Sequence, residues 1–213
     1  MSSGTSGTRL PVLSLALTSG AVDGFTFLAL GQVFTSNMTG NLVLLGLSAG
    51  HGRLSEAVGS LVALVAFICG LVVAFRFIGP ATGWAARTKL AVGAELCLLA
   101  VLAAGWVASW PQLPLVAIAA VAMGGQSAVT HRLRTFVGST TFITGALTVA
   151  ISRHLAPGTG PPHLFELAAV LLTLALGAAA AALCVHLLPV AAPLVAVLGA
   201  AVTVVSSLFV RGR

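Results

Sequence analysis

The sequence predicts an all-α, polytopic membrane protein with six transmembrane helices. Hydrophobic residues make up 58% of the chain and charged residues only 7%, a composition that is far from that of a soluble globular domain. Six apolar segments approach the roughly 20 residues that a helix needs to cross a bilayer. They cover residues 10–30, 57–79, 90–108, 115–130, 164–188 and 190–210. We therefore expect a single membrane domain over residues 1–213, surrounded by the lipid bilayer and without a soluble domain.

Two further apolar stretches, residues 39–50 and 144–154, are too short to cross a bilayer. Each begins with the same dipeptide, Thr39-Gly40 and Thr144-Gly145, and the two pairs lie 105 residues apart. The same offset aligns Gly20 with Gly125, Leu28 with Leu133, Thr35 with Thr140 and Leu42 with Leu147. These matches suggest an internal duplication, with repeats at about residues 10–108 and 115–210.

The positions of the basic residues favour six crossings over eight. The chain has 10 Lys and Arg residues and a formal charge of +6, but they are scattered at the ends of the apolar segments, so no nucleic-acid partner is expected. If the two short stretches dip in and return on the same side, only Arg53 lies outside. Eight crossings would divide the basic residues equally between the two sides. The positive-inside rule therefore predicts six spans with cytoplasmic N- and C-termini.

An odd number of crossings per repeat has a topological consequence. Each repeat would consist of a span, a short re-entrant half-helix and two further spans, so the second repeat enters the membrane upside down. Such inverted repeats are typical of transporters and channels, whose sites lie near the midplane where the repeats meet.

Polar residues precede each predicted half-helix. Non-helical backbone at membrane depth must be buried in protein or line a polar cavity, and two half-helix N-termini near the centre would favour an anion or a polar oxygen. The alternative is that these polar residues only cap and pack the turns. The candidate substrate-binding residues are Asp23, Gln32, Thr35, Ser36, Asn37, Thr39, Gly40, Asn41, Gln126, Thr140, Thr144 and Gly145.

Asp23 is the most informative candidate, because a carboxylate within a span costs about 2.5–3.5 kcal/mol on insertion scales. Three roles are open to it: a proton-coupling acid, a cation ligand, or a structural acceptor for a polar residue of the re-entrant turn. His131 is a second candidate for coupling, although it could equally be an interfacial residue beside Arg132. For Glu95, in the third span, we expect a structural ion pair with a basic residue at the cytoplasmic face, which could be Arg76, Arg87 or Lys89.

Residues 20–46 also resemble a known family. The resemblance is carried by Asp23-Gly24, by residues 34–41 and by Gly125-Gln126, which are similar to the YoaK family of bacterial membrane proteins, described only as being of unknown function. It implies a six-span protein of the bacterial inner membrane and supplies no substrate. In the second copy, Ala128 and Ala146 stand where the first has Asp23 and Asn41, so any site would be asymmetric.

The function that these observations predict is a membrane transporter or channel for a small polar or anionic solute. The chain has no nucleotide-binding loop pattern, no hydrolytic Ser/His/Asp arrangement and no metal-ligand spacing, so we expect no enzyme, cofactor or metal. Two alternatives remain: a scaffold or accessory membrane protein without a permeation path, and an intramembrane enzyme that acts on lipid. A homodimer is also left open.

Overall fold

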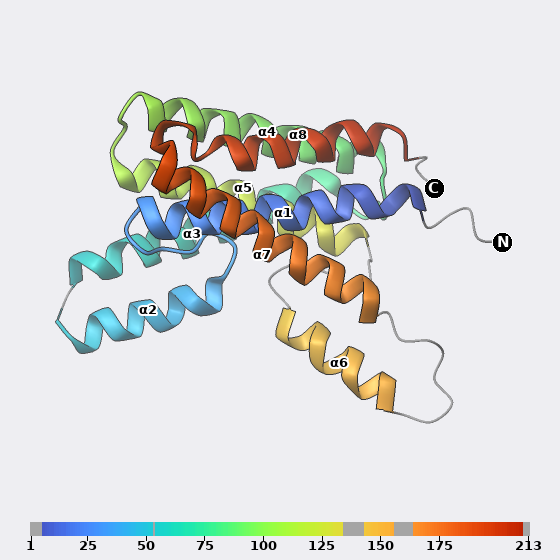
Figure 1. Ribbon diagram of the computed structural model, residues 1–213, viewed down its shortest axis with the longest axis horizontal. Coiled ribbons are helices and arrows are strands. Elements are labelled where there is room, and N and C mark those ends of the chain that lie inside the picture. Colours follow the sequence, from blue (N-terminus) through green and yellow to red (C-terminus); the bar gives the residue numbers. More distant parts are fainter. Residues whose placement is uncertain (1–5, 53, 134–142, 156–163, 211–213) are drawn as a thin grey trace.

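A computed structural model describes residues 6–52, 54–133, 143–155 and 164–210, which contain helices and no strand. This confirms the all-helical class predicted from the composition. The helices are shown in Figure 1: α1 (Ser6–Ala29), α2 (Met38–Gly50), α3 (Leu54–Ile78), α4 (Ala86–Val107), α5 (Gln112–Leu133), α6 (Ile143–Leu155), α7 (Leu164–Leu187), the short 3-10 helix η2 (Pro189–Ala191) and α8 (Leu194–Leu208).

Six of the described segments are long and apolar enough to cross a membrane. They are Arg9–Ala29, Ala57–Ile78, Ala86–Val107, Gln112–Leu133, Leu164–Leu187 and Pro189–Leu208. The six-span prediction is confirmed, and its largest error is at α5, which is longer at both ends than the predicted 115–130. Pro114 lies in the first turn of α5, where a missing N–H does not break a helix, so the helix starts before this proline rather than after it.

The long helices form a bundle in which α1 is central. α1 packs most extensively on α7 and also on α8, while α3 packs on α5 (Figure 1). α1 and α5 run antiparallel. The side chain of Gln126 donates a hydrogen bond to the Leu15 carbonyl at 3.0 Å, and that of Gln112 donates to the Leu30 carbonyl at 2.5 Å.

Glycines bring the backbones together at the α1–α7 and α3–α5 contacts. A Cβ atom added at Gly20 or Gly177 would collide with a backbone carbonyl oxygen across the α1–α7 contact. One added at Gly70 or Gly124 would do the same across the α3–α5 contact. In membranes, helices associate through close packing of small residues, so both contacts depend on the absence of these side chains.

The two short helices, α2 and α6, occupy opposite ends of the bundle. Each has 13 residues, which at about 1.5 Å per residue gives a length well below the roughly 30 Å of the hydrocarbon core. Figure 1 shows that both helices start near the middle of the bundle's length and run outward, α2 towards one end and α6 towards the other. α2 packs against α3, and α6 packs against α7.

Candidate functional site

The chain between α1 and α2 folds back along α1. It begins with two left-handed residues, Gly31 at φ 83° and Gln32 at φ 58°. After this reversal, the hydroxyl of Ser36 lies 2.9 Å from that of Ser19, which is ten residues before the end of α1. Ten helical residues correspond to about 15 Å, or roughly half the thickness of a hydrocarbon core. The start of α2 is therefore placed near mid-depth of α1.

The carboxylate of Asp23 holds this returning chain in place. Its Oδ1 accepts the N–H of Thr35 at 2.7 Å, the hydroxyl of Thr35 at 3.2 Å and the N–H of Ser36 at 2.8 Å. Its Oδ2 accepts the hydroxyl of Ser36 at 2.6 Å. Hydrogen bonds to a charged acceptor are the stronger ones in proteins. Of the three roles left open for Asp23, this is the geometry of a structural acceptor.

Two asparagines complete the turn. The side chain of Asn41 is 1% exposed and binds both backbone groups of Phe34, with Nδ2 donating to the carbonyl at 2.5 Å and Oδ1 accepting the N–H at 3.0 Å. Asn37 is the N-cap of α2, and its Oδ1 accepts the N–H of Gly40 at 3.2 Å. Asn41 thus provides hydrogen-bond partners for backbone groups of the non-helical chain between α1 and α2. Asn37 does so for one N–H group at the start of α2.

The same substitution at these two asparagines is expected to have different effects. Asn41→Ser removes both hydrogen bonds to the backbone of Phe34 and should lower the free energy of unfolding by about 1–3 kcal/mol, because buried backbone groups lose their partners. Asn37→Ser keeps an oxygen at the N-cap, where serine and asparagine are nearly equivalent, so its effect should be a few tenths of a kcal/mol. Equilibrium unfolding in mixed detergent micelles measures both changes. Equal losses in the two variants would contradict the assignment of Asn41.

The candidate residues before and within α2 divide into two groups by exposure. Thr35, Ser36 and Asn41 are buried and are occupied in holding the turn. Gln32, Asn37 and Thr39 are exposed, and Gly40 is half-buried. A Cβ at Gly40 would lie 2.9 Å from the ring of Phe34, which stacks on Phe27 with centroids 4.8 Å apart. Glycine at position 40 therefore lets the ring lie against the first turn of α2.

The second predicted copy is described only in part. Thr140 and the side chain of Thr144 lie outside the described residues. α6 begins at Ile143, so the predicted start near Thr144 agrees with the structure within one residue. Gly145 is exposed, and a Cβ added there would have no neighbour within 4 Å. Among the described residues, no contact is found between the candidates near the start of α2 and those near the start of α6.

Gln126 and His131 do not join Asp23. Gln126 is buried and binds the carbonyl of Leu15, eight residues before Asp23 in α1. His131 is exposed and contacts the ring of Phe75 edge-on at 5.4 Å. These two residues lie away from Asp23 for a geometric reason. α1 and α5 pack antiparallel, so their C-terminal halves lie at opposite ends of the contact.

The expected ion pair of Glu95 is also wrong. Glu95 is 2% exposed, and neither of its carboxylate oxygens has a hydrogen-bond partner among the described residues. Lys89, one of its expected partners, donates instead to the carbonyl of Val210 at 2.8 Å. The ion pair that is present in the described part joins the exposed side chains of Arg9 and Glu166 at 3.2 Å. Residue spacing along the sequence gave no sign that Glu95 faces the bundle interior.

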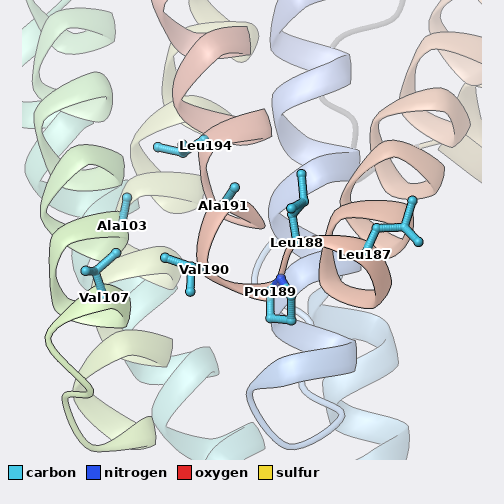
Figure 2. A pocket seen from close by; sticks show the side chains of 8 residues that line it. All are labelled: Ala103, Val107, Leu187, Leu188, Pro189, Val190, Ala191 and Leu194. Carbon is cyan, nitrogen blue, oxygen red and sulfur yellow. The ribbon is translucent and has the colours of Figure 1, made fainter.

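A pocket of about 330 Å³ lies away from these residues, where the C-terminal part of α4 meets the α7–α8 connection. Figure 2 shows its lining side chains, all of which are apolar: Ala103, Val107, Leu187, Leu188, Pro189, Val190, Ala191 and Leu194. None of them is a candidate residue, so this pocket offers no side-chain hydrogen bond to a polar solute.

Comparison with known proteins places the chain in a family. Residues 12–206 match the family described as "Protein of unknown function (DUF1275)". The chain is 39% identical over 137 residues to the "UPF0700 transmembrane protein YoaK" of Bacillus subtilis (strain 168), a match that covers 62% of this chain and 61% of the relative. No solved structure matches. The chain belongs to the DUF1275 family of membrane proteins, the YoaK family that residues 20–46 resemble.

Proposed function

We propose that this protein is a membrane transporter for a small polar or anionic solute, which binds between the N-termini of α2 and α6. The observation that carries this proposal is the placement of the two short helices, which start near the middle of the bundle and run to opposite ends (Figure 1). Helix N-termini carry partial positive charge and N–H groups without an intrahelical partner, so they favour anions and polar oxygens. Such a transporter moves its solute unchanged and needs no cofactor.

The proposed architecture is a pair of inverted repeats, residues 10–108 and 115–210. Three observations support it. α1 and α5 are antiparallel, and glycines face backbone carbonyls at both the α1–α7 and the α3–α5 contact. The hydroxyl of Thr26 lies 3.4 Å from the Asp23 carbonyl, and that of Thr130 lies 3.0 Å from the Ser127 carbonyl. A shift of 104 residues relates these two pairs, one less than the shift that relates the Thr-Gly pairs.

The orientation of the protein follows from its charges. The Lys and Arg side chains that the structure describes lie where α1 begins, α3 ends, α4 begins and α5 ends: Arg9, Arg76, Arg87, Lys89 and Arg132. The antiparallel contacts bring these helix ends to the same end of the bundle. By the positive-inside rule, this end faces the cytoplasm, and both termini lie inside. The membrane would be the bacterial plasma membrane.

Flux through proteoliposomes tests the proposal, with chloride, formate, acetate, glycine and glutamate as the probes. Thr39 is exposed in the first turn of α2, and Thr39→Val removes its hydroxyl while keeping the side-chain shape. We expect this change to lower the flux of the transported probe about two- to tenfold, the loss of one hydrogen bond.

Val43→Thr is the matched control, because it adds a hydroxyl one turn later on the exposed side of the same helix. Wild-type flux in this variant, together with reduced flux in Thr39→Val, supports the site. Equal flux in the two variants would show that Thr39 is not part of the solute-binding site. If the wild-type protein carried none of the probes faster than empty liposomes, the scaffold alternative would replace the transporter.

A further inference from the structure

Two apolar clusters in the bundle are separated by polar residues. The first cluster contains Leu99 of α4 and Met123 of α5, and the second contains Val92 of α4 and Val129 of α5. On both helices, one buried polar residue lies between the two clusters. That residue is Glu95 on α4 and Gln126 on α5, and each is 2% exposed.

The helices α1 and α8 show the same interruption. In α1, Leu15 belongs to the second cluster and Ala21 to the first, with the buried Thr18 and Ser19 between them. In α8, Ala200 belongs to the first cluster and Val204 packs against the second, with Thr203 between them. Both threonines are 0% exposed. Four helices thus contribute to one buried polar layer, which we define as Thr18, Glu95, Gln126 and Thr203.

The side-chain oxygens of Glu95 and Gln126 in this layer lack donors among the described residues. The amide of Gln126 is fixed by its Nε2, which donates to the Leu15 carbonyl at 3.0 Å, and its Oε1 has no hydrogen-bond partner among the described residues. Both carboxylate oxygens of Glu95 are likewise buried without a hydrogen-bond partner among the described residues. The Thr203 hydroxyl is occupied, since it lies 2.8 Å from Ser14 Oγ and 3.0 Å from the Gly199 carbonyl. Three buried acceptor atoms in this layer therefore have no donor among the described residues, which is costly for each of them.

We propose that Glu95 is a reversible proton-binding site and that its protonated carboxyl donates a hydrogen bond to Oε1 of Gln126. Binding adds one proton from water to a Glu95 oxygen and forms an O–H bond, and release returns the proton to water. The added hydrogen turns one of the acceptors into a donor, so the polar layer then has a donor for an acceptor that lacked one. This site lies apart from the α2 turn and does not rest on the proposed transport activity.

No described charged group balances Glu95 in place of a proton. α4 packs against α3, α5, η2 and α8, and the described side chains of η2 and α8 include no titratable group. On α5, Arg132 lies over the ring of Phe75 at 5.1 Å and His131 contacts the same ring. The remaining described titratable side chains on α3 and α4 are exposed or bound elsewhere: Cys69, Arg76, Arg87, Lys89 and Cys97.

Infrared difference spectroscopy of the full chain in lipid vesicles, recorded over a pH titration, tests this proposal. We expect a carboxylic-acid C=O band in the wild-type protein that Glu95→Gln lacks. Glu166→Gln should retain the band, because Glu166 is an exposed carboxylate paired with Arg9. Gln126→Leu should shift its frequency, because the hydrogen-bond acceptor is lost.

Glu95→Gln also keeps the side-chain shape and replaces the carboxyl O–H with an amide donor. Its melting temperature should therefore match or exceed that of the wild type. Spectra of Glu95→Gln and wild type that are identical at every pH would overturn the proposal. So would a Glu95 band that sodium chloride removes at constant pH while choline chloride does not, a result that assigns the site to Na⁺. The infrared band is measured without any solute, so its absence would contradict the proton site and not the proposed transport. A failed Thr39 flux test would contradict the proposed transport site and not the proton site.

Discussion

Gly177→Val is expected to lower the free energy of unfolding of the bundle by about 3 kcal/mol or more, the upper part of the range for overpacked cores. A Cβ at position 177 would collide with the backbone carbonyl of Leu17 and lie 3.1 Å from the backbone nitrogen of Ala21. These are main-chain atoms of a helix, so they cannot move aside as a flexible side chain would. α7 must therefore move away from α1, and the close packing that holds the central helix is lost.

The control for this change is Gly93→Val in α4, where an added Cβ would have no neighbour within 4 Å. We expect a change of less than about 1 kcal/mol there, since valine is no worse than glycine within a helix. Gly70→Val, at the α3–α5 contact, should match Gly177→Val, because its Cβ would collide with the Val121 carbonyl. Unfolding in sodium dodecyl sulfate titrations ranks the three variants. Similar stability of the 177 and 93 variants would contradict the close approach of α1 and α7.

Asp23→Ala should release the chain between α1 and α2. Alanine leaves the N–H groups of Thr35 and Ser36 and the hydroxyl of Ser36 without the acceptor that they share. Each buried backbone N–H that loses its acceptor costs about 1–3 kcal/mol, so the two together should lower the stability of this turn by about 3 kcal/mol. The measurement is hydrogen–deuterium exchange in detergent, in which the amides of residues 33–41 should exchange faster.

Glu166→Ala provides the contrast for Asp23→Ala. Its carboxylate is 38% exposed and pairs with an Arg9 side chain that is 56% exposed, and exposed pairs of this kind contribute about 0–1 kcal/mol. Exchange in residues 33–41 should be unchanged in this variant. If Asp23→Ala left the exchange of Thr35 and Ser36 as slow as in the wild type, the carboxylate would not be what holds the turn.

The spans could be predicted from sequence because hydrophobic length alone decides whether a helix can cross a bilayer. The short helix α2 was predicted for the same reason, since Thr39 to Gly50 is apolar but too short. Asp23 could be singled out because a carboxylate within a span is rare. Its partners, Thr35 and Ser36, were among the candidates, but that both bind this one carboxylate depends on the fold-back of the chain.

The interior position of Glu95 was beyond prediction, for a different physical reason. A helix that is apolar on all sides gives no periodic signal that tells its buried face from its lipid-facing one. In an 18-residue window of each span, 61% of the α5 residues are buried and only 33% of the α4 residues, yet neither helix has a marked polar face. Hydropathy could therefore predict how deep Glu95 lies in the membrane but not which face of α4 carries it. The expectation of an ion pair at the nearby basic end of the helix was wrong.

The close α1–α7 and α3–α5 contacts have a mechanical consequence. Each contact joins a helix of one proposed repeat to a helix of the other, so a movement of one repeat against the other would break both contacts, whereas a movement of the α1–α7 pair against the α3–α5 pair would keep them. α2 contacts both pairs, because its start is tied to α1 through Asp23 while its length lies along α3. Any sliding of one pair past the other is thus transmitted to the first turn of α2, where Asn37 and Thr39 are exposed.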